Sequence, residues 1–209
     1  CRHEAMTDRR TILKGTCGFA ALAAARWTAA ADRGARTFRF AFQNQSEHPQ
    51  GQGAAHFARR IEERSAGRLR VQLFPAGVLG SDLQAVTALQ RGTLDFTVLN
   101  SGILAAQSRD FAVLDLPFLF HNAREVDAVV DGVAGERLAD ALPAVGIVHL
   151  GYWDLGFRHV TNAKRPVRRP EDLAGLRIRV IQSPIHVDTF RALGAEPVPL
   201  PFPEVRDAL

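Results

Sequence analysis

Two arginines alternate with apolar residues near the end of the chain. A strand over Leu176–Val180 would place its apolar side chains on one face and Arg177 and Arg179 on the other. An arginine inside an α/β sheet is costly unless an anion meets it, because its charge cannot be titrated away. Ligands of such folds bind at the carboxyl ends of strands. Two interpretations stay open: a carboxylate clamp centred on Arg179, or a partly exposed arginine in an ordinary ion pair.

No assembled catalytic or metal-binding motif accompanies these arginines. The segment Gly51–His56 superficially matches a dinucleotide-binding glycine motif, but His56 stands where the third Gly or Ala belongs, and a polar loop separates it from the preceding strand. Neither G-x-S-x-G, H-E-x-x-H nor a Walker loop occurs. The histidines are scattered rather than paired at ligand spacing. We therefore expect no metal, no cofactor and no enzymatic activity.

A repeating β-α pattern must position the first half of any site. Alternation predicts strands over residues 37–42 and 69–73, and a more apolar run predicts a third over 94–99. The spacing of apolar residues predicts a helix that starts at Ala54 and stops at Gly67, and another over 81–92. Ser81 and Gln84 form a capping box at the start of the second helix. A β-α-β-α-β order with such connections favours a parallel α/β sheet.

The second half of the chain contains shorter elements. Its composition predicts packed irregular structure over 114–120, helices over 122–130 and 135–141, strands over 147–152 and 157–161, and a basic loop over 162–170 that crosses between two lobes. After the Arg179 strand, Ser183 offers a capping hydroxyl, Pro184 suits the first helical position and Gly194 ends the helix. An extended piece over 197–201 precedes a helix that reaches Leu209 without a C-cap, so we expect the chain to stop within an element.

The positive charge of the chain is concentrated at its beginning. Residues 1–31 carry five basic and two acidic side chains, which leaves 21 basic and 20 acidic ones in residues 32–209. This near balance argues against a nucleic-acid partner. Arg9-Arg10 precede the apolar run 15–25 and the small residues 29–31, a pattern typical of a twin-arginine-like export signal over residues 1–31. Both cysteines lie in this segment, so residues 32–209 contain no disulfide.

A series of motifs extends over most of the remaining chain. The motifs, in order, are His48-Pro49, Phe74-Pro-Ala-Gly-Val-Leu-Gly-Ser-Asp82, Gly92-Thr-Leu-Asp95, Leu116-Pro-Phe-Leu-Phe120, Gly156-Phe-Arg-His-Val-Thr-Asn162, Pro170–Val180 and Gly194–Phe202. Together they resemble the solute-binding proteins of tripartite ATP-independent periplasmic (TRAP) transporters, of the dicarboxylate-binding DctP type. The likeness covers essentially residues 38–209.

This resemblance implies a fold and a site. The fold would be α/β, with two periplasmic-binding-protein-like lobes and a ligand cleft between them: residues 32–160 form the first lobe, and residues 161–209 begin a second lobe that is incomplete in this chain. The arginine matching Arg179 would grip the ligand carboxylate and Arg158 would assist, unless Arg158 is only a surface residue. By position, the remaining cleft residues would be Gln182, Asn100, Phe202 and His48.

The leading hypothesis is therefore a periplasmic protein that captures an organic acid and delivers it to the integral membrane permease subunits of the transporter. Four-carbon dicarboxylates, sugar acids and keto acids all fit an arginine clamp. Three alternatives stay open: a ligand-sensing periplasmic domain, a small exported α/β enzyme, and a truncated product without activity. The missing nucleophile and base count against the enzyme.

Overall fold

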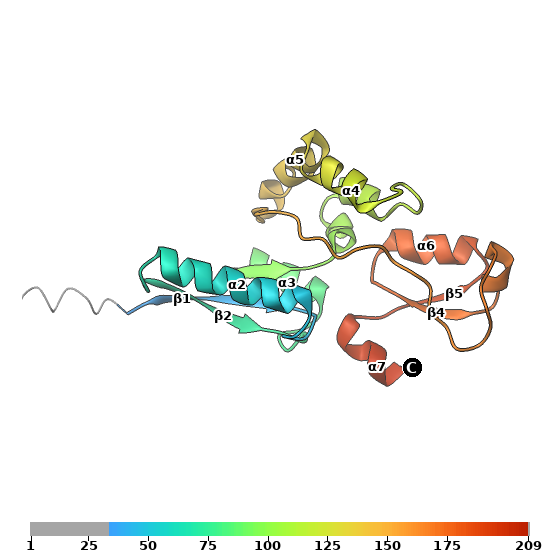
Figure 1. The fold of residues 1–209 in the computed structure, drawn as a ribbon, viewed down its shortest axis with the longest axis horizontal. Helices are drawn as coiled ribbons and strands as arrows, with labels where there is room; N and C mark the ends of the chain where they lie inside the picture. Colours follow the sequence, from blue (N-terminus) through green and yellow to red (C-terminus); the bar gives the residue numbers. More distant parts are fainter. Residues whose placement is uncertain (1–33, 209) are drawn as a thin grey trace, which may run out of the picture.

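The computed structural model describes residues 34–208, so the predicted export signal lies outside the described residues. Its first part is a three-stranded parallel sheet in the order β2-β1-β3 (Figure 1). The strands are β1 (Arg36–Phe42), β2 (Leu69–Phe74) and β3 (Phe96–Val98). Because the three strands are parallel, their carboxyl ends lie at one edge of the sheet.

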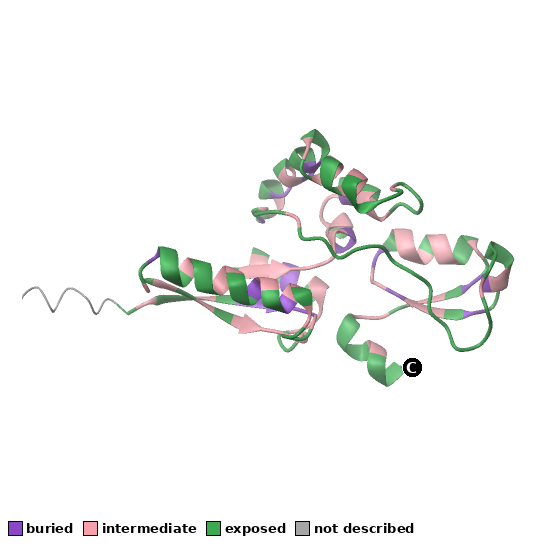
Figure 2. Cartoon of the chain, in the orientation of Figure 1, coloured by how far each residue is buried: buried purple, intermediate pink, exposed green. Residues whose placement is uncertain are grey.

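Two helices pack on opposite faces of β1, because successive side chains of a strand point in opposite directions. Helix α2 (Pro49–Arg64) covers the face of Phe40 and Phe42, and its own Ala54 is fully buried in this contact. Helix α3 (Asp82–Gln90) packs its Ala85 against Ala41 on the other face. Figure 2 shows the buried residues of this part gathered at the sheet.

A helical region follows β3. It comprises the 3₁₀ helices η1 (Ser101–Ala106) and η2 (Arg109–Asp115), the α-helices α4 (Ala123–Val130) and α5 (Val133–Asp140), and the short η3 (Pro143–Val145). Its core is built around Phe111, Leu142 and Ile103, together with Val86 from α3. The shared core joins this region to the first sheet.

A second, two-stranded parallel sheet holds the predicted clamp. It consists of β4 (Arg177–Val180) and β5 (Glu196–Pro199), with α6 (Pro184–Ala192) between them in sequence. Leu173, from η4 (Pro170–Leu173), is buried with Leu176 and Ala195. The described chain ends with η5 (Phe202–Glu204) and α7 (Val205–Ala208) (Figure 1). None of the described helices is long and apolar enough to span a bilayer.

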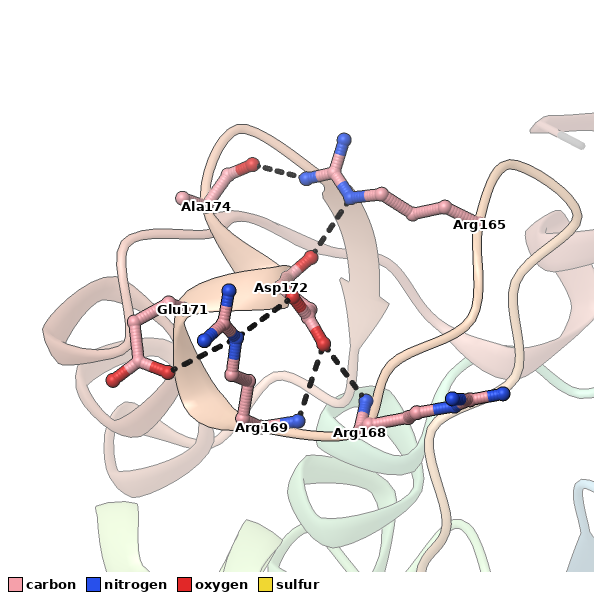
Figure 3. A network of polar contacts seen from close by, with 6 residues as sticks. All are labelled: Arg165, Arg168, Arg169, Glu171, Asp172 and Ala174. Atoms are coloured by element: carbon pink, nitrogen blue, oxygen red, sulfur yellow. Dashed lines mark hydrogen bonds and ion pairs between the residues drawn. The ribbon is translucent and has the colours of Figure 1, made fainter.

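The basic loop before β4 is held by its own polar contacts (Figure 3). Asp172 accepts hydrogen bonds from the backbone N–H groups of Arg168 and Arg169, which lower the pKa of its carboxyl. Arg165 donates to the carbonyl oxygens of Asp172 and Ala174. These contacts, together with the ion pairs of Arg169 with Glu171 and Asp172, stabilise the turn that leads into β4.

Several predicted elements are confirmed. Among the described residues, β1 to β4 begin within two residues of their predicted starts, the extended piece predicted over 197–201 corresponds to β5, and the Ser81–Gln84 capping box is present in both directions. Gly194 ends the α6 segment with a φ of +79°, a conformation that glycine adopts without strain. Helix α2 begins at Pro49 rather than at Ala54, because His48 caps it and Pro49 suits its first turn.

Three local predictions were wrong. Residues 147–152 and 157–161 are not strands: among the described residues no neighbour pairs with them, and Val148 and Leu150 are 74% and 69% exposed. Residues 116–119 are exposed rather than packed, and Phe118 is 94% exposed. The Ser183 hydroxyl does not cap α6, because it donates to Asp115 instead.

Candidate functional site

Arg179 lies one residue before the end of β4, and its guanidinium is half-buried. Its Nε and Nη2 both donate to the carbonyl oxygen of Leu200, at 3.0 and 2.6 Å, just beyond the end of β5. This shared carbonyl fixes the direction of the side chain. Burial, and then the nearby positive charge of Arg158, lower the pKa of Arg179, while Asp82 acts in the opposite direction.

Arg158 comes from a different part of the chain and reaches the same neighbourhood. It lies on the extended segment 147–162, which has an exposed backbone and side chains over most of its length. Trp153 anchors this segment: its ring packs edge-to-face on Phe40, with centroids 6.3 Å apart, and a Cβ on Gly53 would lie 3.0 Å from it. The positive charge of Arg158 therefore acts on Arg179 from a segment of the chain that is separate from β4.

Asp82 is an acidic group that the sequence-based site did not include. It is the first residue of α3, and its Oδ1 is buried without a hydrogen-bond partner in the described part of the chain. Burial raises the pKa of Asp82 to about 6, against the smaller opposing effects of the Gln43 amide and of Arg179. Gln43, also missed, has an equally unpartnered Oε1 and donates its Nε2 to Gly80.

The signal for these two residues was present in the sequence but weak. Gln43 directly follows β1, and Asp82 follows the capping residue of α3, so both come near the edge where the carboxyl ends of strands meet. Nothing in their residue types separates them from ordinary loop polar groups. They stand out only because their oxygen atoms are buried, and this burial depends on the packing of the Gly77–Gly80 turn.

Two of the predicted site residues act as helix caps. His48 accepts the N–H of Gln50 on its Nδ1 at 3.1 Å, at the start of α2. Asn100 accepts the N–H of Gly102 on its Oδ1 at 3.0 Å, at the start of η1. Both residues lie just beyond strands of the first sheet. In each, however, the side-chain acceptor atom is already engaged by a backbone N–H and is not free for a ligand.

Gln182 and Phe202 lie on the second sheet's side. Gln182 lines a shallow hollow of about 370 Å³ together with residues of α6 and Pro199. Phe202 begins η5 and is 49% exposed. Its neighbour Pro203 touches the first part of the chain, since a Cβ on Gly77 would collide with the Pro203 ring.

The arrangement is suited to binding an anion rather than to covalent chemistry. Arg179 and Asp82 come from two separate elements, and each affects the pKa of the other, while the positive charge of Arg158 also acts on Arg179. Among residues 34–208, no group of three or more His, Cys, Asp or Glu side chains is placed to hold a metal ion.

Comparison with known proteins agrees with this geometry. The chain is 35% identical over 175 residues to the 2,3-diketo-L-gulonate-binding periplasmic protein YiaO of Escherichia coli, covering 84% of this chain and 53% of that protein. The structure superposes on the sugar acid binding protein DctPAm of Advenella mimigardefordensis, solved with galactonate, with a TM-score of 0.81 and 37% identity over 83% of this chain and 56% of the other.

A third match is a TRAP periplasmic solute-binding protein of Sulfurospirillum deleyianum with bound succinate, with a TM-score of 0.80 and 34% identity, covering 83% of this chain and 56% of that one. The chain thus spans about half the length of the relatives it matches. The model of the DctP family, bacterial extracellular solute-binding protein family 7, matches residues 40–209. The chain therefore belongs to this family of solute-binding proteins.

Proposed function

We propose that the chain is the ligand-capturing part of a periplasmic protein that binds an organic acid through an arginine–carboxylate clamp and delivers it to a TRAP membrane permease. The observation that carries the proposal is the placement of Arg179, whose half-buried guanidinium is aimed by the Leu200 carbonyl just beyond the end of β5. Burial, and then repulsion by the positive charge of Arg158, lower the pKa of Arg179, while Asp82, which acts in the opposite direction, itself favours the neutral form up to about pH 6. A bound carboxylate would relieve this repulsion.

The chemistry of the relatives' ligands supports an organic acid as substrate. Their names report a diketo sugar acid, galactonate and succinate, and each of these compounds carries a carboxylate. A guanidinium can give a carboxylate two parallel charge-assisted hydrogen bonds, which an ammonium cannot do. Arg179, already aimed by the Leu200 carbonyl, would form such bonds without a large loss of side-chain freedom.

Calorimetric titration of the full-length protein with succinate, galactonate and 2,3-diketo-L-gulonate tests the proposal. Each charge-assisted hydrogen bond contributes about 1.5–3 kcal/mol. At about 1.4 kcal/mol per decade, Arg179→Ala should weaken binding of the best acid by roughly two to three orders of magnitude. Arg179→Lys should recover only part of the loss, and Arg158→Ala should cost less than Arg179→Ala.

Arg177→Ala is the matched control, because Arg177 lies on the same strand but is exposed. It should leave the affinity within about threefold of wild type, since an exposed charge contributes about 0–1 kcal/mol. A folded Arg179→Ala protein that binds the best acid as the wild type does would refute the clamp. Delivery is tested separately by uptake of the labelled acid in cells that lack the gene.

A further inference from the structure

Three polar side chains meet where η2 touches the start of α6. The carboxylate of Asp115, the last residue of η2, accepts a hydrogen bond from the Ser183 hydroxyl on its Oδ2 at 3.2 Å. The Nε2 of His186 lies 3.1 Å from the same oxygen, although the two groups are not aligned for an ideal hydrogen bond. The side chains of Asp115 and His186 are only 7% and 13% exposed, and Ser183 is completely buried.

The placement of Ser183 shows that this contact takes precedence over local helix chemistry. Ser183 occupies the N-cap position of α6, where a serine hydroxyl usually accepts an N–H from the first turn. Here it makes no such bond and donates to Asp115 instead. A buried carboxylate without partners is costly, so the Ser183 hydrogen bond compensates Asp115 from the other side of the contact, where the His186 ring also lies against it.

Asp115 is also held tightly from its own side. Its Oδ2 lies against the backbone of η1, and a Cβ on Gly102 would collide with it. The N–H of Gly102 is in turn bound by Asn100, at the end of the first sheet. The carboxylate therefore sits between the segment that follows β3 and the helix that follows β4, two segments more than 60 residues apart in sequence. Figure 1 shows α6 beginning beside the η2 segment.

We infer that Asp115 is a positioning residue that fixes the start of α6 against the first part of the molecule. In doing so it sets the turn between Val180 and Ser183, which connects directly to Arg179 and carries Gln182. Its role for the ligand rests on the proposed function above, whereas its role in placing α6 does not. Loss of the carboxylate should leave both sheets intact but let the second sheet adopt a range of positions relative to the first.

The distance between the two sheets is the primary measurement, made on the full-length protein without ligand. Spin labels on Ala55→Cys in α2 and Arg191→Cys in α6 occupy exposed positions in a stretch, residues 34–208, that has no cysteine of its own. We expect a narrow distance distribution in the wild type and a broader, shifted one in Asp115→Ala. Asp115→Asn keeps an acceptor oxygen for Ser183 and should fall between the two.

Asp110→Ala is the control, because Asp110 lies on the same 3₁₀ helix but is exposed. Ser183→Ala and His186→Gln each remove one partner and should broaden the distribution less than Asp115→Ala. They also test the inference if Asp115→Ala does not fold. The inference that Asp115 fixes α6 would be overturned if the distance distribution of Asp115→Ala matched that of the Asp110→Ala control. The same holds if both partner variants matched this control.

Binding of succinate and galactonate to the same variants tests the link to the clamp. Asp115→Ala should weaken binding by about fivefold to a hundredfold, the range typical of coupling between separate sites. Unchanged affinity together with a broadened distance distribution would refute the positioning of the clamp. If the wild type binds none of the organic acids, the proposed function fails, while the distance measurement still decides whether Asp115 holds α6.

Discussion

Asp82 connects the charge of the site to the pH of the medium. Its pKa is raised from the ordinary value of 3.8 to about 6, chiefly because burial disfavours the charged form. The folded protein therefore binds the proton more tightly than the unfolded chain does. This group's contribution to stability is fully present below about pH 4 and is lost as the pH rises through 6.

Asp82→Asn should remove this pH dependence. A pKa difference of about two units corresponds to a stability contribution on the order of 3 kcal/mol, at 1.36 kcal/mol per unit. The variant should be more stable than the wild type at pH 7 and about equal to it at pH 4. Urea unfolding at the two pH values measures the difference. Asp95→Asn, on an exposed residue, is the control, and parallel pH profiles for wild type and Asp82→Asn would contradict the prediction.

Among single elements, α3 depends on a cap that the structure shows complete. Ser81 accepts the N–H of Gln84, and the Gln84 side chain accepts the N–H of Ser81 in return. Ser81→Ala should lower the free energy of unfolding by about 0.5–2 kcal/mol, because an N–H of the first turn loses its partner. Chemical denaturation measures this loss. Ser81→Thr keeps a hydroxyl and should recover most of it; a Ser81→Ala protein as stable as wild type would contradict the role.

The same elements show where sequence reasoning succeeds and where it stops. Period-two alternation identified β1, β2 and β4 among the described strands, because their apolar faces are fixed by the sheet and its covering helices, whereas β3 was predicted from an apolar run and β5 only as an extended piece. The strands predicted over residues 147–152 and 157–161 do not form, because among the described residues no neighbouring strand supplies hydrogen bonds to them. Whether a segment forms a strand depends on a neighbouring strand that can bond to it as well as on its own sequence.

The site was predictable to a similar degree. Alternation and the family resemblance pointed to Arg179 and Arg158, and the positive charge of Arg158 acts on Arg179 in the structure. Local sequence could not reveal that Asp82 is buried beside them. It also assigned Ser183 to the wrong partner, since the competing acceptor, Asp115, lies 68 residues earlier in the chain. Such contacts depend on how distant segments meet.

For the molecule as a whole, the decisive question is whether it reaches the periplasm in the folded state. The matched relatives include proteins named as periplasmic, while the predicted export signal of this chain lies outside the described residues. Replacing Arg9 and Arg10 by lysine should strongly reduce the periplasmic fraction, if export depends on the arginine pair. Cell fractionation with immunoblotting measures it, and Arg2→Lys is the control. An undiminished periplasmic fraction would exclude twin-arginine export.

The packing of Trp153 on Phe40 also gives the protein an internal optical probe. The chain has two tryptophans, and the other, Trp27, lies in the predicted export signal, so Trp153 is the sole indole of residues 34–208. It is 41% exposed and lies five residues before Arg158 on the same extended segment. An acid that draws Arg158 toward Arg179 should change the exposure of this ring. Emission should then shift in wavelength on addition of ligand, and the shift should be absent in Arg158→Ala, so that capture can be timed by stopped-flow fluorescence without any added dye.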